Sequence, residues 1–174
     1  REDGKNHELI RFFVTDDKNQ LPVRLDMFLS FGSAKAYLPG MKGLQLAFDS
    51  LDEGSYLPHR YTSPVCVCYT GTHDNDTTRS WYQMLRPECR DKVRRYTHCS
   101  NDTHFPLDLI GTALASVAAY AIFPLQDVLC VGAEGRMNTP GVGAGNWSWR
   151  YQQSALKGEL ADELRGMTTL YGRY

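Results

Sequence analysis

The chain has 174 residues, of which 42% are hydrophobic and 22% charged, a composition typical of one globular domain. Its 19 Lys and Arg residues nearly balance its 20 Asp and Glu residues, which excludes a strongly basic surface for binding nucleic acid. The longest apolar stretch, near 107–125, is interrupted by Asp, Gly, Ser and Pro, which argues against a membrane span.

The first part of the chain contains several short apolar segments. Residues 1–22 are mostly polar and irregular, although the apolar run at 9–14 predicts a short strand or a buried turn. Residues 23–31 alternate loosely and predict a strand. Residues 40–49 follow a Pro-Gly turn and predict a buried strand. The clearest strand is 65–70, whose β-branched, nearly all-apolar run suits a parallel sheet covered on both faces.

Helices dominate the middle of the chain. A helix is expected to begin near Arg79, with Asp76 or Thr77 as its capping residue. Pro87 is expected to begin a second helix through Tyr96. Residues 107–120 are apolar nearly all round and predict a largely buried helix.

The last part of the chain continues the alternation of strands and helices. Residues 121–125 predict a strand, and 159–170 predict a terminal amphipathic helix. Buried strands alternating with helices indicate an α/β fold with a parallel sheet. The five cysteines include no CxxC pair, so we expect reduced and mostly buried thiols.

The densest polar cluster lies at 70–77, directly after the clearest strand. At the end of a buried strand, His73 and Asp74 can hold an imidazole and a carboxylate against a ligand. The structural alternative is a helix-capping loop, in which Gly makes the turn and Asp caps the helix. A third interpretation is a metal hydrolase with His73, Asp74 and Asp76 as ligands, although no well-spaced partner follows downstream.

Several sequence blocks resemble one enzyme family and occur in its order. They are LPGMKGLQLAFD (38–49), YLPH (56–59), YTGTHDNDTT (69–78), PLQDVL (124–129), RMNTPG (136–141) and GNWSWR (145–150). Together they resemble the C-terminal part of the 4-α-glucanotransferases, also called amylomaltases or disproportionating enzymes, of glycoside hydrolase family 77. The closing YGR (171–173) is similar to the plant and algal plastid enzymes. The resemblance covers 38–174 and leaves 1–37 as a divergent N-terminal segment.

This resemblance implies the C-terminal portion of a (β/α)8 barrel, incomplete in a chain shorter than the about 250 residues of a full barrel. It also implies a retaining transglycosylase that passes α-1,4-glucan segments between maltooligosaccharides. Asp74 matches the family's transition-state-stabilising carboxylate, and His73 beside it binds the same sugar. Tyr56 aligns with an aromatic residue on the acceptor side, and Asn138 with an asparagine of the donor cleft. For Trp147 and Trp149 we expect a packing role that closes the barrel.

The first 37 residues match the family less cleanly, and two alignments compete. In one, VRLDMFLSF (23–31) resembles the nucleophile block, Asp26 is the nucleophile, and Met27 and Leu29 replace a His and an Arg. In the other, Glu2 is a remnant of the acid/base block. The first is favoured because it has more matches, and a third interpretation is that neither segment is homologous. Under each of these three interpretations, at least one catalytic carboxylate is absent from the chain.

We therefore expect an impaired 4-α-glucanotransferase, with a catalytically inactive glucan-binding relative as the alternative. Expected partners are α-1,4-glucans and maltooligosaccharides, without nucleic acid or membrane. The family's chemistry relies on carboxylates, so the resemblance implies no cofactor and no metal. A plant or algal source would imply a plastid location, and any other source a cytoplasmic one.

Overall fold

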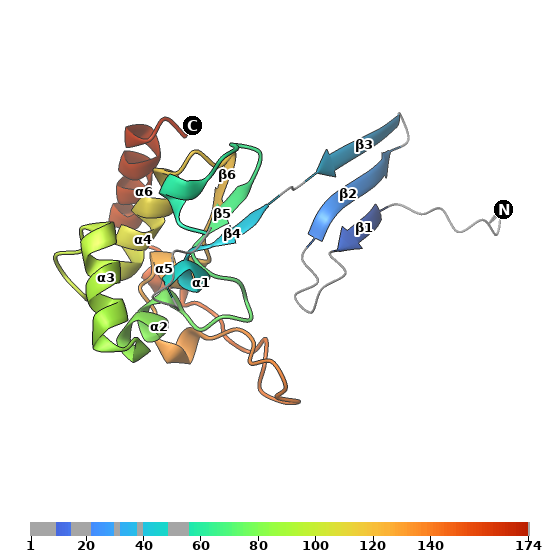
Figure 1. Ribbon diagram of the computed structural model, residues 1–174. Coiled ribbons are helices and arrows are strands. Elements are labelled where there is room, and N and C mark those ends of the chain that lie inside the picture. Colours follow the sequence, from blue (N-terminus) through green and yellow to red (C-terminus); the bar gives the residue numbers. More distant parts are fainter. Residues whose placement is uncertain (1–9, 15–21, 30–31, 38–39, 49–55, 174) are drawn as a thin grey trace.

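The computed structural model of the chain describes residues 10–14, 22–29, 32–37, 40–48 and 56–173 (Figure 1). In the first three of these ranges the structure describes the backbone alone. Glu2 lies outside the described residues.

The N-terminal strands form an antiparallel sheet of their own, in the order β1-β2-β3. These strands are β1 (Ile10–Val14), β2 (Pro22–Leu29) and β3 (Gly32–Tyr37). The expectation of a short strand within 9–14 and of a strand within 23–31 is confirmed, whereas β3 was not predicted. Asp26 lies in the middle strand, where its backbone pairs with Arg11 on one side and Lys35 on the other.

A second sheet is parallel and has the order β4-β5-β6, with strands β4 (Met41–Gly43), β5 (Val67–Tyr69) and β6 (Tyr120–Ile122). Parallel neighbours require crossover connections, and the segments between these strands contain helices. Cys68 pairs with Lys42 and Ala121, so those three residues share one face of the sheet. The helices α2, α3 and α4 lie together on one side of this sheet (Figure 1).

The predicted strand at 40–49 is wrong beyond Gly43, because the chain turns there into the short helix α1 (Leu44–Phe48). Leu44, Ala47 and Phe48 of this helix are buried while Leu46 is exposed, and so short an apolar run carries no periodicity that separates a strand from a helix. The backbone N–H of Gln45 donates to the carbonyl of Thr70, 3.2 Å away, which ties α1 to the end of β5.

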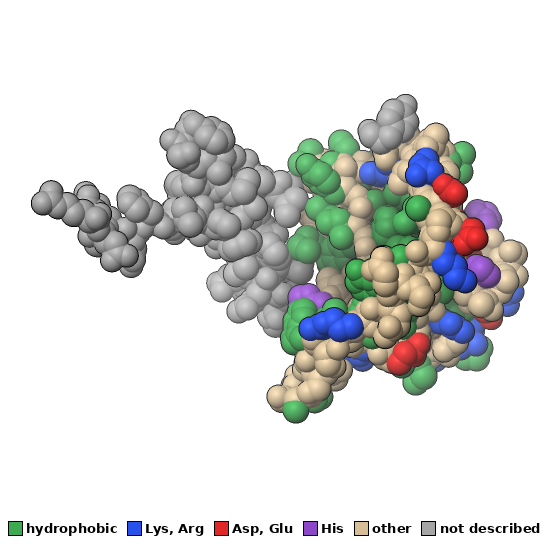
Figure 2. Space-filling view, turned by 180° about the vertical axis from the view of Figure 1, so that it is seen from behind, with side chains coloured by type: hydrophobic (Ala, Val, Ile, Leu, Met, Phe, Trp, Pro, Cys, Tyr) green, Lys and Arg blue, Asp and Glu red, His purple; other side chains and the backbone are tan. Residues whose placement is uncertain are grey.

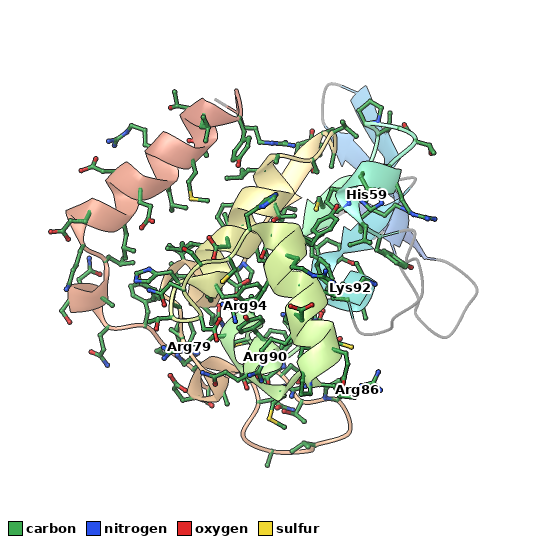
Figure 3. The ribbon with its side chains drawn as sticks, turned by 60° about the vertical axis from the view of Figure 1, so that its left-hand side comes forward. His59, Arg79, Arg86, Arg90, Lys92 and Arg94 are labelled. Carbon is green, nitrogen blue, oxygen red and sulfur yellow. The ribbon has the colours of Figure 1, made fainter. Side chains whose placement is uncertain are left out.

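Two helices follow β5, close to their predicted positions. They are α2 (Thr78–Met84) and α3 (Pro87–Thr97). Thr77 is the N-cap of α2, and its hydroxyl accepts from the backbone N–H of Ser80 at 3.3 Å. Arg90 of α3, labelled in Figure 3, donates to the carbonyls of Tyr82 and Gln83 at the end of α2. The guanidinium therefore satisfies terminal carbonyls of α2 and fixes the corner between the two helices.

The central helix α4 (Phe105–Leu114) is buried as predicted, but it ends six residues earlier than expected. Tyr120 belongs to β6 instead, and the strand predicted for 121–125 stops at Ile122, before α5 (Leu125–Val128). The core around α4 is made of side chains from both sheet and helices, including Leu44, Phe48, Cys68, Tyr82, Val93, Phe105, Leu109 and Ala113.

The C-terminal helix α6 (Gly158–Leu170) covers the other side of α4, where Leu164 and Met167 pack against Leu107, Ile110 and Leu114. Short 3-10 helices occur at η1 (Pro58–Arg60), η2 (Ala133–Gly135) and η3 (Gln153–Ala155). The expectation for the thiols is confirmed, because the five cysteines are free and four of them are buried. Within the described ranges, no helix is both long and apolar enough to cross a membrane.

Candidate functional site

The loop between β5 and α2, residues 70–77, has a defined local structure. The side-chain oxygen of Asn75 accepts from both the backbone N–H and the hydroxyl of Thr72, each at 2.8 Å. In return, the backbone N–H of Asn75 donates to the carbonyl of Thr72. The side chain and the backbone of Asn75 both bond Thr72, and this turn presents His73 and Asp74 at its tip.

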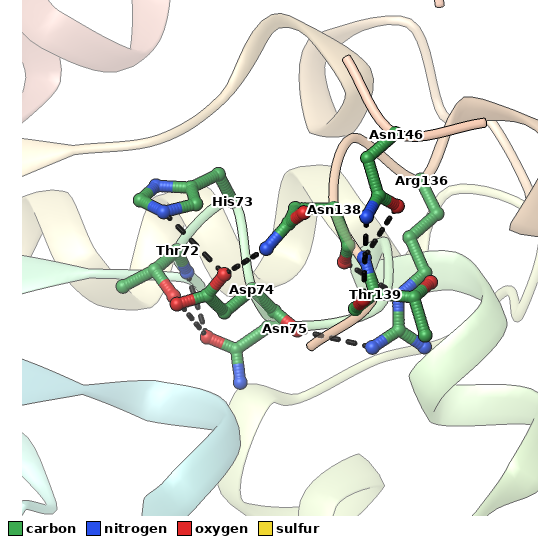
Figure 4. Close-up of polar contacts among 8 residues, drawn as sticks. All are labelled: Thr72, His73, Asp74, Asn75, Arg136, Asn138, Thr139 and Asn146. Carbon is green, nitrogen blue, oxygen red and sulfur yellow. Dashed lines mark hydrogen bonds and ion pairs between the residues drawn. The ribbon is translucent and has the colours of Figure 1, made fainter. Parts of the chain in front are cut away.

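Asp74 is the centre of the polar contacts at this tip (Figure 4). Its Oδ1 accepts a hydrogen bond of 2.5 Å from Asn138 Nδ2 and lies 3.4 Å from His73 Nε2. Arg136 bridges the two loops, because its guanidinium donates to the backbone carbonyls of Asp74 and Asn138, both at 3.0 Å. Segments separated by more than 60 residues therefore meet at a single carboxylate.

The loop that carries Asn138 is closed by Asn146. The side-chain oxygen of Asn146 accepts from the backbone N–H of Thr139 at 2.9 Å, and the side-chain NH2 of Asn146 donates to the carbonyl of Val142 at 2.9 Å. Trp147 follows with φ of 60°, a left-handed conformation that is uncommon for a bulky residue. Its ring packs against the His73 imidazole, with 5.0 Å between centroids, while 54% of the residue stays exposed.

A cavity of about 400 Å³ opens beside this arrangement, and its lining includes His73, Arg136 and Trp147. The floor comes from the parallel strands, through Tyr69 of β5 and Ile122 of β6. The cavity thus lies where strand ends meet the two polar loops, the usual position of a site in parallel α/β folds. Its combination of aromatic and hydrogen-bonding groups suits a neutral, hydroxyl-rich ligand better than an ion.

Two carboxyl groups near the cavity have structural partners. Burial raises the pKa of Asp127, and the hydrogen bonds from Thr70 and Thr78 oppose that rise. Asp76 accepts from the backbone N–H of Thr77 and from the hydroxyl of Ser80, so it is committed to the start of α2. Among the residues that the structure describes, no group of three His, Cys, Asp or Glu side chains is placed to hold a metal ion.

The structure brings together three of the predicted site residues, namely His73, Asp74 and Asn138. Tyr56 lies elsewhere, with the Lys42 ammonium 5.3 Å from its ring centroid, and it is not among the described residues that line the cavity. Asp26 is described only by its backbone within β2, and Glu2 lies outside the described residues.

Two residues of the site were missed by the sequence interpretation. Arg136 has no sequence signal beyond its place in the block at 136–141, and its two carbonyl contacts depend on tertiary structure. The packing role expected for Trp147 stays a prediction, whereas the structure shows its exposed ring in contact with His73 and lining the cavity. Trp149 is partly buried and lines a different cavity, next to Tyr151 and Leu160.

Comparisons with known proteins agree on one family. The family model for 4-alpha-glucanotransferase matches residues 32–156. A 4-alpha-glucanotransferase of Synechocystis is 48% identical over 135 residues, covering 78% of this chain and 27% of the relative. The chloroplastic/amyloplastic 4-alpha-glucanotransferase of Solanum tuberosum is 44% identical over 138 residues, covering 78% of this chain and 24% of the relative.

A solved structure shows the same relationship. The amylomaltase from Streptococcus agalactiae in complex with acarbose superimposes with a TM-score of 0.74 and 30% identity, covering 78% of this chain and 28% of that one. This likeness confirms the expected α/β fold, the C-terminal portion of a (β/α)8 barrel. The chain spans about a quarter of the length of the curated relatives it matches. With more than half of its residues matched by the family model, the chain belongs to the 4-alpha-glucanotransferase family.

Proposed function

We propose that this chain forms part of a 4-α-glucanotransferase and binds α-1,4-glucans at the site of His73, Asp74 and Asn138. The observation that carries the proposal is the convergence of the His73 and Asn138 side chains on one carboxylate oxygen of Asp74, beside an aromatic-lined cavity. The family membership supports it, and so does the acarbose in the similar amylomaltase.

The geometry suits a sugar approaching its transition state. Glycosyl transfer passes through an oxocarbenium-like state, in which positive charge develops on the sugar ring. A fixed carboxylate such as Asp74 binds ring hydroxyls and interacts more strongly as that charge grows. His73 supplies a second hydrogen-bonding group for the same sugar. The exposed ring of Trp147 offers an apolar face against which a sugar can pack.

The complete retaining reaction also requires a nucleophile and an acid/base, with their carboxyl groups about 5–5.5 Å apart. We propose Asp26 as the nucleophile, with Glu2 as the alternative acid/base remnant. Neither alignment of residues 1–37 supplies both groups. We therefore propose that transfer by this chain is impaired, since a lost nucleophile or acid/base costs orders of magnitude in rate.

Calorimetric titration of the chain with maltoheptaose tests the binding proposal. We expect binding by the wild type and an affinity lower by about tenfold or more for Asp74→Asn, since a charge-assisted hydrogen bond is removed. Asp91→Asn is the matched control, because Asp91 is an exposed carboxylate of α3 that pairs with Arg95 at 3.1 Å. A folded wild-type chain that takes up no maltoheptaose would contradict the proposal.

Glucose release from maltotriose then separates the enzyme from its alternative. Slow release that Asp26→Asn abolishes supports transferase activity with Asp26 as nucleophile. Binding without release supports a glucan-binding relative that has lost catalysis.

The names of the plant relatives include chloroplastic/amyloplastic. For a plant or algal source we propose a plastid location, which fractionation of isolated plastids would test.

A further inference from the structure

A buried carboxylate, that of Asp127 on α5, lies between the two ends of the loop that carries His73 and Asp74. Thr70 at the start of the loop donates its hydroxyl to Asp127 Oδ2 at 2.5 Å. Thr78 at the far end donates its hydroxyl to the same oxygen at 2.8 Å, and its backbone N–H to Oδ1 at 3.2 Å. A single side chain from a distant part of the sequence therefore joins both ends of the loop.

These contacts are protected from water. Asp127 is 1% exposed, and Thr70 and Thr78 are fully buried. Gln45 of α1 extends the network, since its amide donates to the Thr78 hydroxyl at 3.2 Å and to the carbonyl of Asp76 at 3.1 Å. A buried carboxylate is costly unless its oxygens are satisfied by donors, and here two hydroxyls and one N–H supply them.

Every contact that Asp127 makes with the loop ends runs in one direction, with the protein donating and the carboxylate accepting. An amide in the same position would retain only one acceptor oxygen and would place an NH2 group against the donors. The arrangement is therefore specific to a carboxylate. Between these anchor points, the tip of the loop is held by Arg136, which donates to the carbonyl of Asp74, and by Asn138, which donates to its carboxylate.

We propose that Asp127 is a positioning residue, whose carboxylate fixes the ends of the 70–78 segment and thereby sets the placement of His73 and Asp74 toward the sugar. The inference rests on the proposed function, because it assigns a purpose to the placement of those two side chains. Asp127 lines the cavity, but it is only 1% exposed and its oxygens accept from Thr70 and Thr78, so it acts through these two residues.

Amide hydrogen exchange on the full chain measures how firmly Asp127 fixes the 70–78 segment, without any ligand. The backbone N–H groups of Thr72 and Asn75 are hydrogen-bonded within the loop and report on its opening. The variants are Asp127→Asn, the milder Thr78→Val, and Thr78→Ser, which retains the hydroxyl. Thr97→Val is the matched control, since the buried Thr97 hydroxyl donates to the carbonyl of Val93 within α3, away from the loop.

We expect Asp127→Asn and Thr78→Val to speed exchange at Thr72 and Asn75 by about tenfold or more, beyond any change in global stability by urea unfolding. Thr78→Ser should restore slow exchange, and Thr97→Val should leave the loop unchanged. Loop exchange that merely follows global stability in all four variants would show an ordinary structural role and overturn the proposal.

A maltoheptaose titration of the same proteins separates this inference from the function on which it rests. Affinity that falls in Asp127→Asn and Thr78→Val, and recovers in Thr78→Ser, supports the positioning role. Normal affinity in Asp127→Asn, despite a mobile loop, overturns the positioning role while the proposed function stands. A folded wild type without affinity overturns the proposed function, and the positioning role fails with it.

Discussion

At the scale of single residues, the contact between Asn138 and Asp74 gives the sharpest prediction. The Asn138 amide donates to Asp74 Oδ1 at 2.5 Å, and Arg136 fixes the backbone of both residues by donating to their carbonyls. Asn138→Asp replaces this donor with a second carboxylate beside the first, so attraction becomes repulsion between like charges. We expect maltoheptaose affinity to fall by about tenfold or more, as for other losses of a hydrogen bond to a charged group.

The control for this prediction is Asn101→Asp, which makes the same chemical change at an exposed turn. There the side-chain oxygen accepts from the backbone N–H of Thr103, and aspartate retains that acceptor. Calorimetry measures the affinity, and circular dichroism confirms that both variants are folded. Equal affinities for Asn138→Asp and the wild type would show that Asn138 takes no part in the site.

The same scale shows what sequence can and cannot reveal about the site. Adjacent polar residues at the end of a buried strand, together with the family resemblance, singled out His73, Asp74 and Asn138, which the structure brings together. The contact of Trp147 with His73 was not predicted, because the direction of its ring depends on a positive φ and on the loop closed by Asn146. Neither feature has a local signal, since positive φ is expected at Gly rather than Trp.

At the scale of secondary-structure elements, the largest error in a helix boundary lies at the end of α4. The predicted helix over 107–120 is mostly apolar, but α4 ends at Leu114, where Arg173 reaches the carbonyls of the last helical residue and of the segment after it. Its Nε donates to the carbonyl of Leu114 at 2.6 Å, and its Nη2 to those of Ser116 at 2.6 Å and Ala118 at 3.0 Å. This helix end is therefore set by a residue near the C-terminus, which periodicity cannot detect.

Removal of this guanidinium should destabilise the fold. Arg173→Ala leaves three carbonyls without their charged donor, and we expect a loss of about 1.5–3 kcal/mol in the free energy of unfolding. Arg165→Ala is the matched control, because its pair with Asp162 is exposed on α6 and such pairs contribute about 0.2–1 kcal/mol. Urea unfolding measures the loss of stability in both variants, provided that the m-value, the dependence of the free energy on urea concentration, is unchanged. Equal losses in the two variants would contradict the capping role of Arg173.

At the scale of the whole molecule, the parallel sheet accounts for the predicted fold class and also leaves an exposed edge at β6. The alternation of strands and helices correctly predicted an α/β fold, whereas the antiparallel β3 had no signal in the sequence interpretation. Within the described parts of the chain, no strand pairs with the outer edge of β6. Tyr120 and Ile122 of this strand are 63% and 56% exposed, and Figure 2 shows further apolar side chains at the surface.

An unpaired edge strand with exposed apolar side chains is a template for association between chains. We therefore expect the chain to self-associate with rising concentration, and Tyr120→Lys to suppress this, because a charged residue on an edge strand opposes pairing. Met84→Lys is the matched control, since Met84 is 81% exposed at the end of α2 and away from the sheet. Sedimentation velocity over a concentration series measures the difference. If both variants reduce association equally, general surface hydrophobicity is the cause, whereas a specific effect of Tyr120→Lys assigns the association to the open edge of the sheet.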